Sequence, residues 1–247
     1  MIGTTMAETV MSTSPRVKIC GIRSEADLDI AVASGADAVG FISGVTHRSE
    51  DALTPEQAAE LVAATPPYVS TVLVTHLEHA EEIVGLAEML SVDTVQVHGL
   101  VSVATLRKVF DQSHRRRRIT RAVHVTGEES VSEALQVVGA CHAVHLDSRT
   151  VDRLGGTGRT HDWSISRKIV DKLALVPLPV ILSGGLRPEN VAEAVEAVQP
   201  FAVDTNSGVE DECGNKDAPR SFKFVAQVRG VPTASGFRSA NFENDCG

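Results

Sequence analysis

This sequence lacks several features that mark common classes of protein. It has only seven Phe, one Trp and one Tyr in 247 residues. The core must therefore be built from Val, Ala, Leu and Ile, which suits buried parallel strands. No G-x-G-x-x-G fingerprint occurs, which argues against a dinucleotide-binding open sheet. No run approaches the ~18 apolar residues of a membrane span, and residues 1–15 lack the basic segment and apolar core of a secretory signal.

Positive charge and paired cysteines are also scarce. The net charge is −9, which argues against a nucleic-acid-binding protein, and the run Arg115–Arg118 is expected to be a solvated loop. The cysteines Cys20, Cys141, Cys213 and Cys246 form no C-x-x-C pair. This spacing excludes zinc ribbons and redox motifs, and it favours free thiols in a reducing compartment. We therefore expect a cytoplasmic protein without nucleic-acid or membrane partners.

Two pairs of histidines are spaced three residues apart, His76 with His79 and His142 with His145. Neither pair is accompanied by the carboxylates or cysteines of a recognisable metal site. We expect structural or surface roles for these histidines and no metal.

From Arg16 onward, short apolar runs alternate with longer amphipathic segments. The expected strands are Arg16–Cys20, Ala38–Phe41, Val69–Val74, Thr94–Val97, Ile119–Val125, Ala143–Leu146 and the runs that begin at Val180 and Phe201. The expected helices are Ser24–Ser34, a helix that begins at Thr54, His79–Leu90, Val101–Val109, Ser130–Val138, Ser164–Leu173, Pro188–Val198 and Ala218–Arg229.

Eight strand–helix units in one domain predict a closed (β/α)8 TIM barrel over residues 16–229, because exposed parallel edges are poorly tolerated. An open, doubly wound sheet is the alternative. Residues 1–15 are expected to form a flexible leader, and residues 230–247 a disordered tail.

Two glycine turns follow the last two expected strands, at Gly184-Gly185 and at Ser207-Gly208. Glycines let backbone N–H groups approach an anion closely, and a helix N-terminus adds partial positive charge. A TIM barrel holds a phosphate at this position. Two ordinary strand-to-helix turns are the alternative interpretation.

Reactive side chains follow other strands. In a barrel, the reacting groups lie at the C-terminal ends of the strands, and these positions hold Cys20, Arg48, His98 and Asp147. Each alone could be a packed, capping or solvated residue. Their shared location predicts one site with a thiol, a guanidinium, an imidazole and a carboxylic acid.

These segments, in this order, resemble the phosphoribosylanthranilate isomerase family from about Val17 to Val225. The motifs are Val17-Lys-Ile-Cys-Gly-Ile22, Gly35-Ala-Asp-Ala-Val-Gly40, Val95-Gln-Val-His-Gly99, Leu146-Asp-Ser148, Gly155-Gly-Thr-Gly158 with Asp162-Trp163, Ser183-Gly-Gly-Leu-Arg-Pro-Glu-Asn-Val191, and Val203-Asp-Thr-Asn-Ser-Gly-Val-Glu210 with Gly214-Asn-Lys-Asp217.

The resemblance implies an isomerase of tryptophan biosynthesis that needs no cofactor. It would catalyse the Amadori rearrangement of N-(5-phosphoribosyl)anthranilate to 1-(2-carboxyphenylamino)-1-deoxyribulose 5-phosphate. Asp147 would be the acid that opens the furanose, and Cys20 the base that removes the proton from the second carbon of the sugar. A thiolate at Cys20 would need nearby positive charge. We expect a monomer or a homodimer.

The resemblance also implies the residues that bind this small phosphorylated substrate. Arg48 would pair bidentately with the anthranilate carboxylate. The remaining substrate-binding residues would be His98, Gly156, Gly184, Gly185, Asp204, Ser207 and Gly208.

Four places depart from the family pattern. The loop Ser43–Thr54 is longer and lacks the usual aromatic residues and proline, and Leu73-Val-Thr-His76 stands where Phe-Val-Asn is usual. Ser183 replaces an alanine, and Asn206 replaces a serine. The alternatives are therefore a paralogue that isomerises a different phosphorylated N-glycoside and a non-catalytic phosphometabolite-binding barrel.

Overall fold

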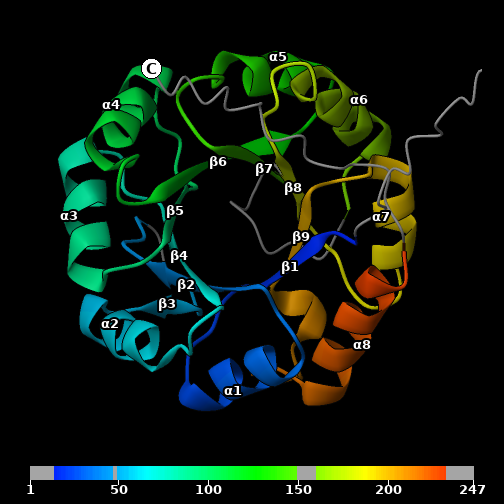
Figure 1. The fold of residues 1–247 in the computed structure, drawn as a ribbon. Helices are drawn as coiled ribbons and strands as arrows, with labels where there is room; N and C mark the ends of the chain where they lie inside the picture. Colours follow the sequence, from blue (N-terminus) through cyan, green and yellow to red (C-terminus); the bar gives the residue numbers. More distant parts are fainter. Residues whose placement is uncertain (1–13, 47–48, 149–159, 232–247) are drawn as a thin grey trace, which may run out of the picture.

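The strands form a central ring, and the helices form an outer ring around it (Figure 1). The computed structural model describes residues 14–46, 49–148 and 160–231, and the structural statements that follow concern these residues.

Eight parallel strands close the barrel. The strands are β1 (Arg16–Ile19), β2 (Ala38–Ser43), β4 (Ser70–Thr75), β5 (Thr94–Val97), β6 (Arg118–Val125), β7 (Ala143–Ser148), β8 (Val180–Leu182) and β9 (Ala202–Thr205), with a two-residue strand β3 (Ala52–Leu53) added beside β2. β1 pairs with β2 on one side and with β9 on the other, so the sheet has no open edge in the ring. The predicted closed barrel is confirmed, and the open doubly wound sheet is excluded.

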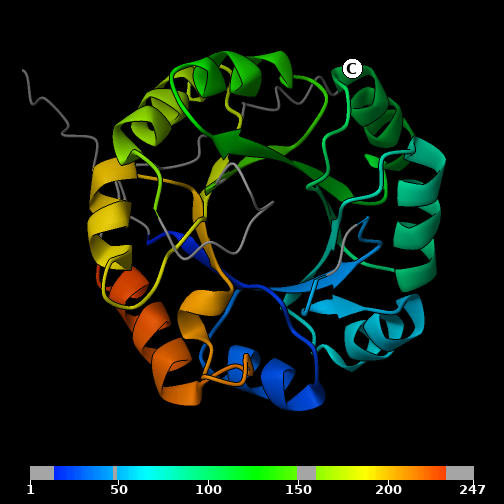
Figure 2. The ribbon, with the colours of Figure 1, turned by 180° about the vertical axis from the view of Figure 1, so that it is seen from behind.

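A helix lies outside each strand of the ring, as the view from the opposite side also shows (Figure 2). The helices are α1 (Glu25–Ala33), α2 (Pro55–Ala64), α3 (Ala80–Leu90), α4 (Val103–Ser113), α5 (Glu129–Gln136), α6 (Trp163–Leu173), α7 (Val191–Val198) and α8 (Ala218–Arg229), and a short 3-10 helix η1 (Ser207–Val209) follows β9.

Local sequence determines where most helices begin. Thr54 and Gln57 form the predicted capping box at the start of α2, and Ser24 caps α1. The predicted start of α7 at Pro188 is wrong, because α7 begins at Val191. The Asn190 side chain accepts a hydrogen bond from the Arg187 amide at 2.8 Å and donates one to the Gly185 carbonyl at 3.0 Å, which keeps the preceding residues in a turn.

Three strands end later than predicted: β4 continues by one residue to Thr75, and the longer extensions of β2 and β7 matter for the site. β2 continues to Ser43, and β7 continues to Ser148, so Asp147 lies within a strand. β1 ends one residue early, and Cys20 directly follows it. Strand geometry therefore orients Asp147, while Cys20 lies where the chain leaves the sheet.

The two faces of the ring differ in chemistry. Residues such as Val17, Ile19 and Phe41 belong to the large apolar core between strands and helices. Alternate residues point to the opposite face, where buried Lys18 and Gln96 lie inside the ring. The barrel therefore has an apolar outer layer, and its other face combines these polar side chains with a small apolar cluster that includes Ile42, Val72 and Val74.

Parts of the two terminal segments lie against α8. The Ser14 hydroxyl donates a hydrogen bond to the Arg229 carbonyl at 2.9 Å, and the Arg229 guanidinium donates one to the Pro15 carbonyl at 3.2 Å. Val231 is buried. Residues 1–13 and 232–247 lie outside the described residues, so the leader and the tail stay predictions.

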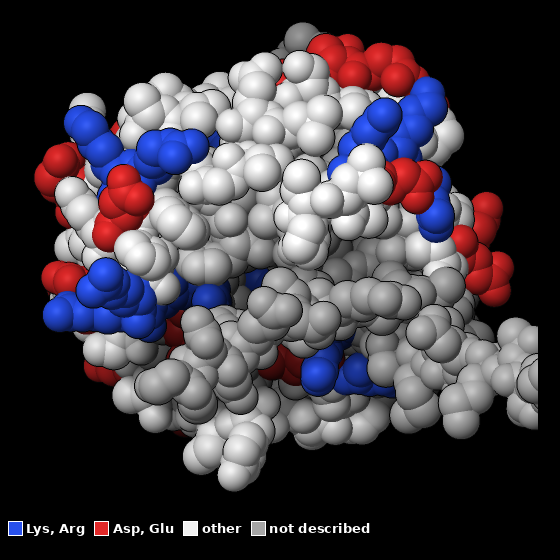
Figure 3. All heavy atoms as spheres, turned by 45° about the horizontal axis from the view of Figure 1, so that its top comes forward, with Lys and Arg blue, Asp and Glu red and all other residues white. Residues whose placement is uncertain are grey.

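Charged side chains of both signs lie near one another on the face drawn in Figure 3, without a continuous basic surface there. Arg115, Arg116 and Arg117 lie in the loop between α4 and β6, as predicted, but the prediction is wrong for Arg118, which is the first residue of β6. No helix among the described residues is long and apolar enough to cross a membrane. The expected lack of nucleic-acid partners stays a prediction.

Phe224 tests the packing of the outer layer. Its side chain is fully buried on α8, and Phe224→Ala is expected to lower the free energy of unfolding by about 3–5 kcal/mol through the cavity left behind. Phe222, two residues earlier on the same helix, is 49% exposed, and Phe222→Ala is expected to change it by no more than about 0.5 kcal/mol. Urea denaturation followed by circular dichroism measures both. Equal losses would contradict this packing.

Candidate active site

Side chains from several strands meet at one mouth of the barrel. Cys20 follows β1, His98 follows β5, and Asp147 lies near the end of β7. All three are less than a tenth exposed. Ring contacts connect His98 to His76, after β4, and to His124, on β6, with centroid distances of 4.9 Å and 5.1 Å. A mostly dry cluster of ionisable groups therefore occupies this mouth.

Cys20 lies against a strand that leaves room for it. A Cβ atom at Gly40 of β2 would lie only 2.7 Å from the Cys20 sulfur, so a glycine is needed there. Burial raises the pKa of the Cys20 thiol to about 11, although the ammonium groups of Lys18 and Lys216 act to lower it. The positive charge required for a thiolate is present, but burial outweighs it. Cys20 is therefore a neutral thiol at neutral pH.

Asp147 is held from two sides. Its Oδ1 accepts a hydrogen bond from the Ser148 amide at 2.8 Å, and its Oδ2 lies 3.4 Å from Nε2 of His98. The Ser148 hydroxyl lies 2.9 Å from Nδ1 of His161, whose Nε2 lies 2.6 Å from the Ser166 hydroxyl. This connection fixes the end of β7, and with it Asp147, against α6.

His98, His124 and Asp147 are the described residues whose positions best fit a metal ion, with one ligand atom from each within 4.8 Å of the others. Nδ1 of His98 lies 3.2 Å from the amide nitrogen of Gln96. An amide nitrogen only donates, so Nδ1 accepts and the ring proton sits on Nε2. A cation would need that nitrogen bare. This arrangement opposes a metal, and its predicted absence stays a prediction.

A polar network fills the barrel below this mouth. Nζ of Lys18 lies 2.7 Å from Oδ2 of Asp204 and donates to Oε1 of Gln96 at 3.0 Å. Nε2 of His145 lies 3.2 Å from the same oxygen of Asp204 and 2.9 Å from the Ser183 hydroxyl. Burial acts to raise the pKa of Asp204, but Lys18 and His145 outweigh it and lower the pKa. Oδ2 of Asp204 already has two partners, Lys18 and His145. The role of Asp204 in binding substrate stays a prediction.

The two glycine turns lie side by side. Gly184 and Gly185 have positive φ angles of 87° and 67°, which glycine adopts without strain. A Cβ atom at Gly208 would lie 1.9 Å from the Leu186 carbonyl oxygen. Among the described residues, the amides of Gly184, Gly185, Ser207 and Gly208 donate no hydrogen bond within the protein. Two adjacent groups of available N–H donors suit a phosphate.

The loop after β2 is attached to the loop after β9. The Asn206 side chain donates a hydrogen bond to Oδ2 of Asp51 at 2.8 Å, and Nε of Arg23 lies 3.8 Å from the other oxygen of Asp51. Two departures from the family pattern, the long loop and Asn206, are thus in direct contact. Arg48 and Gly156 lie outside the described residues, so their roles stay predictions.

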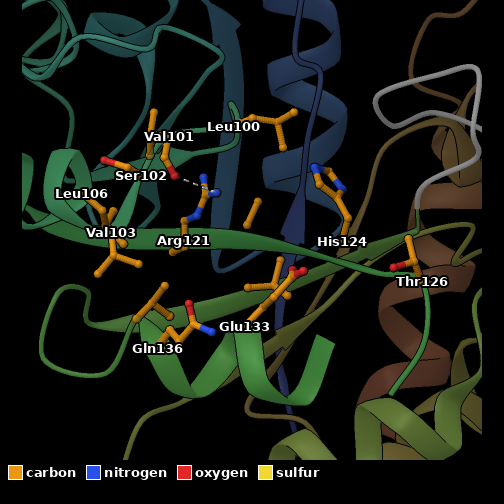
Figure 4. A pocket seen from close by; sticks show the side chains of 13 residues that line it. Leu100, Val101, Ser102, Val103, Leu106, Arg121, His124, Thr126, Glu133 and Gln136 are labelled. Atoms are coloured by element: carbon orange, nitrogen blue, oxygen red, sulfur yellow. Dashed lines mark hydrogen bonds between the residues drawn. The ribbon is translucent and has the colours of Figure 1, made fainter. Parts of the chain in front are cut away.

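A cavity of about 400 Å³ lies between β6, α4 and α5 (Figure 4). Arg121 is the cation in its lining, and it donates hydrogen bonds to the carbonyls of Val97 and Gly99 and, at 3.5 Å, to that of Val101. Its charge is therefore already engaged by the segment that carries His98. Through these hydrogen bonds, Arg121 holds in place the segment that carries His98.

Polar residues within the strands were not predicted to belong to the site. Lys18, Gln96 and His145 each lie between apolar neighbours in a strand, and strict alternation would have placed them inside a closed ring. His145 and His76 were expected to be structural or surface residues, and both are buried inside the barrel. For His142 the structural role is confirmed, since its Nδ1 accepts a hydrogen bond from the Ile119 amide at 2.9 Å.

A model of the N-(5'-phosphoribosyl)anthranilate isomerase family matches residues 17–227 of this chain. The chain belongs to this family. An N-(5'-phosphoribosyl)anthranilate isomerase 2 from Methanosarcina mazei is 41% identical over 219 residues, covering 87% of this chain and 94% of the relative.

Solved structures of phosphoribosyl anthranilate isomerases share the fold. That of the Thermotoga maritima protein has a TM-score of 0.76 and 36% identity, and the match covers 88% of this chain and all of the other. Another, in complex with reduced 1-(o-carboxyphenylamino)-1-deoxyribulose 5-phosphate, has a TM-score of 0.71 and 33% identity, with 88% of this chain and all of the other covered. The predicted membership of the phosphoribosylanthranilate isomerase family is confirmed.

The paired turns predict how this family member binds an anion. In Gly208→Ala the new methyl group would collide with the Leu186 carbonyl and displace the N–H donors. Affinity for inorganic phosphate should fall about 10- to 100-fold, the effect of losing one hydrogen bond to a charged group. Isothermal titration calorimetry measures it. The control is Gly85→Ala on α3, where no atom lies within 4 Å of the added methyl. Unchanged affinity in Gly208→Ala would exclude phosphate from these turns.

Proposed function

We propose that this chain catalyses the Amadori rearrangement of N-(5'-phosphoribosyl)anthranilate to 1-(2-carboxyphenylamino)-1-deoxyribulose 5-phosphate in tryptophan biosynthesis. The observation that carries this proposal is a buried thiol and a buried carboxyl at the same mouth of the barrel as two turns with available amides. The reaction needs an acid, a base and a phosphate anchor. The reaction is an isomerisation without net oxidation or reduction of the substrate, so no redox cofactor is required.

Asp147 is the proposed acid. It gives its proton to the furanose ring oxygen, the bond between that oxygen and the first carbon breaks, and the nitrogen lone pair forms the iminium. The carboxylate that remains is stabilised by the Ser148 amide, which already donates to Oδ1 at 2.8 Å. The site is nearly closed to water around Asp147, so this hydrogen bond acts at low dielectric, where it is strong.

Cys20 is the proposed base. Its thiolate removes the proton from the second carbon of the open-chain iminium, which gives an enol. The enol becomes the ketone when the first carbon gains a proton and the hydroxyl on the second carbon loses its proton. The Lys18 and Lys216 ammonium groups favour the thiolate. Because burial holds the resting group as a thiol, only a small fraction of free enzyme carries the active base at neutral pH.

The two ends of the substrate are assigned to different loops. The turns at Gly184-Gly185 and Ser207-Gly208, together with Gly156, would hold the phosphate, and Arg48 would pair with the anthranilate carboxylate. His98 lies beside Asp147 and would face the reacting sugar. We expect a cytoplasmic monomer or homodimer, which the buried free thiols at Cys20 and Cys141 suit.

One observation favours a second candidate. The long loop after β2, attached through Asp51 and Asn206, lies at the end assigned to the aromatic ring. A paralogue acting on another phosphorylated N-glycoside would keep Cys20 and Asp147 and differ here. Rescue of a tryptophan auxotroph that lacks this isomerase separates the two candidates, since only the first should restore growth.

Removal of either proposed catalytic group tests the mechanism. Cys20→Ala and Asp147→Asn should each lower kcat about 10²- to 10⁴-fold, the usual contribution of one general acid or base. Loss of substrate fluorescence on conversion measures the rate. Cys213→Ala removes an exposed free cysteine and should keep full activity. Full activity in either site variant would overturn the assigned roles.

The raised pKa of Cys20 gives a pH dependence with a definite sign. Its ordinary pKa lies near 9, and burial raises it to about 11 in the folded enzyme. The thiolate fraction should therefore increase about tenfold per pH unit between pH 7 and 9. The ultraviolet absorbance of the thiolate, taken as the difference between the wild type and Cys20→Ala, measures this increase, with circular dichroism as a control for folding. A Cys20 thiolate that is already fully formed at pH 9 would contradict the raised pKa.

A further inference from the structure

Three buried side chains connect β1 to Asp147 through the barrel interior. The Lys18 ammonium donates to Oε1 of Gln96 at 3.0 Å. The amide nitrogen of Gln96 lies 3.2 Å from Nδ1 of His98, and Nε2 of His98 lies 3.4 Å from Oδ2 of Asp147. Lys18, Gln96 and His98 are each less than a tenth exposed, so water does not compete for these contacts.

The Lys18 ammonium group determines which atom donates and which accepts in each of these contacts. An ammonium group can only donate, so the Gln96 atom that faces Lys18 is its oxygen, and the atom that faces His98 is its NH2 group. Nδ1 of His98 must then accept. A neutral imidazole carries one proton, which therefore sits on Nε2 and points toward Asp147.

The charge states of Lys18 and His98 agree with this direction. Burial acts to lower the pKa of Lys18, but Asp204 and Cys20 outweigh it and raise the pKa, so the ammonium persists. Burial, reinforced by His76, His124, His145 and Lys18, holds the pKa of His98 well below its ordinary value. His98 therefore stays neutral and keeps one proton.

We propose that Gln96 and Lys18 are positioning residues that fix His98 as the Nε2–H tautomer, so that this N–H donates to Asp147 as the carboxyl loses its proton. The proposal rests on the proposed role of Asp147 as the acid. At 3.4 Å the contact is longer than an ordinary hydrogen bond. Such contacts tighten when negative charge develops, so the bond is stronger in the transition state than in the resting enzyme. With the other tautomer, a bare nitrogen would face the carboxylate and repel it.

The first test reads the tautomer directly, without substrate. The free protein is labelled with 15N-histidine, and the His98 signals are assigned by their loss in His98→Asn. At pH 7, Nε2 is expected to be protonated and Nδ1 bare. A proton on Nδ1, alone or together with one on Nε2, would overturn the proposal. This outcome does not depend on turnover, so it is distinct from failure of the proposed function, which would appear as wild-type protein without isomerase activity.

Gln96→Glu reverses the direction of the contact between residue 96 and Nδ1 of His98. The introduced carboxylate can accept from Lys18 but cannot donate to His98, so a proton must move to Nδ1. The 15N signals should shift accordingly, and kcat should fall at least about tenfold, as expected when a histidine at an active site is held in the wrong tautomer, while KM stays within about twofold. Gln96→Met removes both contacts without added charge and should give a mixture of tautomers and an intermediate kcat.

Gln112→Glu on α4 makes the same change at an exposed position and should alter neither the tautomer nor kcat. Thermal melts check that each variant folds. An unchanged kcat in Gln96→Glu, despite a changed tautomer, would overturn the positioning role. An unchanged tautomer in that variant would show that Gln96 does not set the tautomer of His98, and it would overturn the proposal.

Discussion

Lys18 of β1 and Asp204 of β9 face each other where the first and last strands of the chain meet, paired in register and 2.7 Å apart. Both side chains are almost completely buried, and removing one partner of such a pair leaves an uncompensated charge that costs about 3–5 kcal/mol. The same ammonium reaches Gln96 and lowers the pKa of the Cys20 thiol against the larger effect of burial. The same ion pair thus connects the first and last strands of the ring and influences the charge state of Cys20 in the active site.

Burial has different effects on the two proposed catalytic groups, Asp147 and Cys20. Around Asp147 it excludes water and leaves the Ser148 amide and His98 as the neighbours of the carboxyl. At Cys20 it raises the pKa of the thiol to about 11, which keeps most of the base inactive in the free enzyme. A buried thiol is also protected from oxidation. Burial therefore lowers the fraction of active thiolate in the free enzyme and at the same time gives a dry site in which the thiol is protected.

The family model matches residues 17–227, a range that holds the reacting groups and both glycine turns. The departures from the family pattern lie in the loop after β2, at Leu73–His76, at Ser183 and at Asn206. Asp51 of that loop and Asn206 are hydrogen-bonded to each other at 2.8 Å. Through this hydrogen bond, the loop after β2 and Asn206 form one connected surface at the end of the site assigned to the aromatic ring.

The sequence by itself determined the eight strand–helix units, the capping box at Thr54, the glycine turns and the positions of Cys20 and Asp147, because each depends on local periodicity or on a short motif. It could not determine that Lys18, Gln96, His98 and Asp147 are connected by successive contacts. These residues come from three strands whose inner faces meet only when β1 closes against β9 and β2. Nor could it give the pKa of Cys20, because burial and the nearby ammonium groups oppose each other and only their distances in the folded chain decide which is larger.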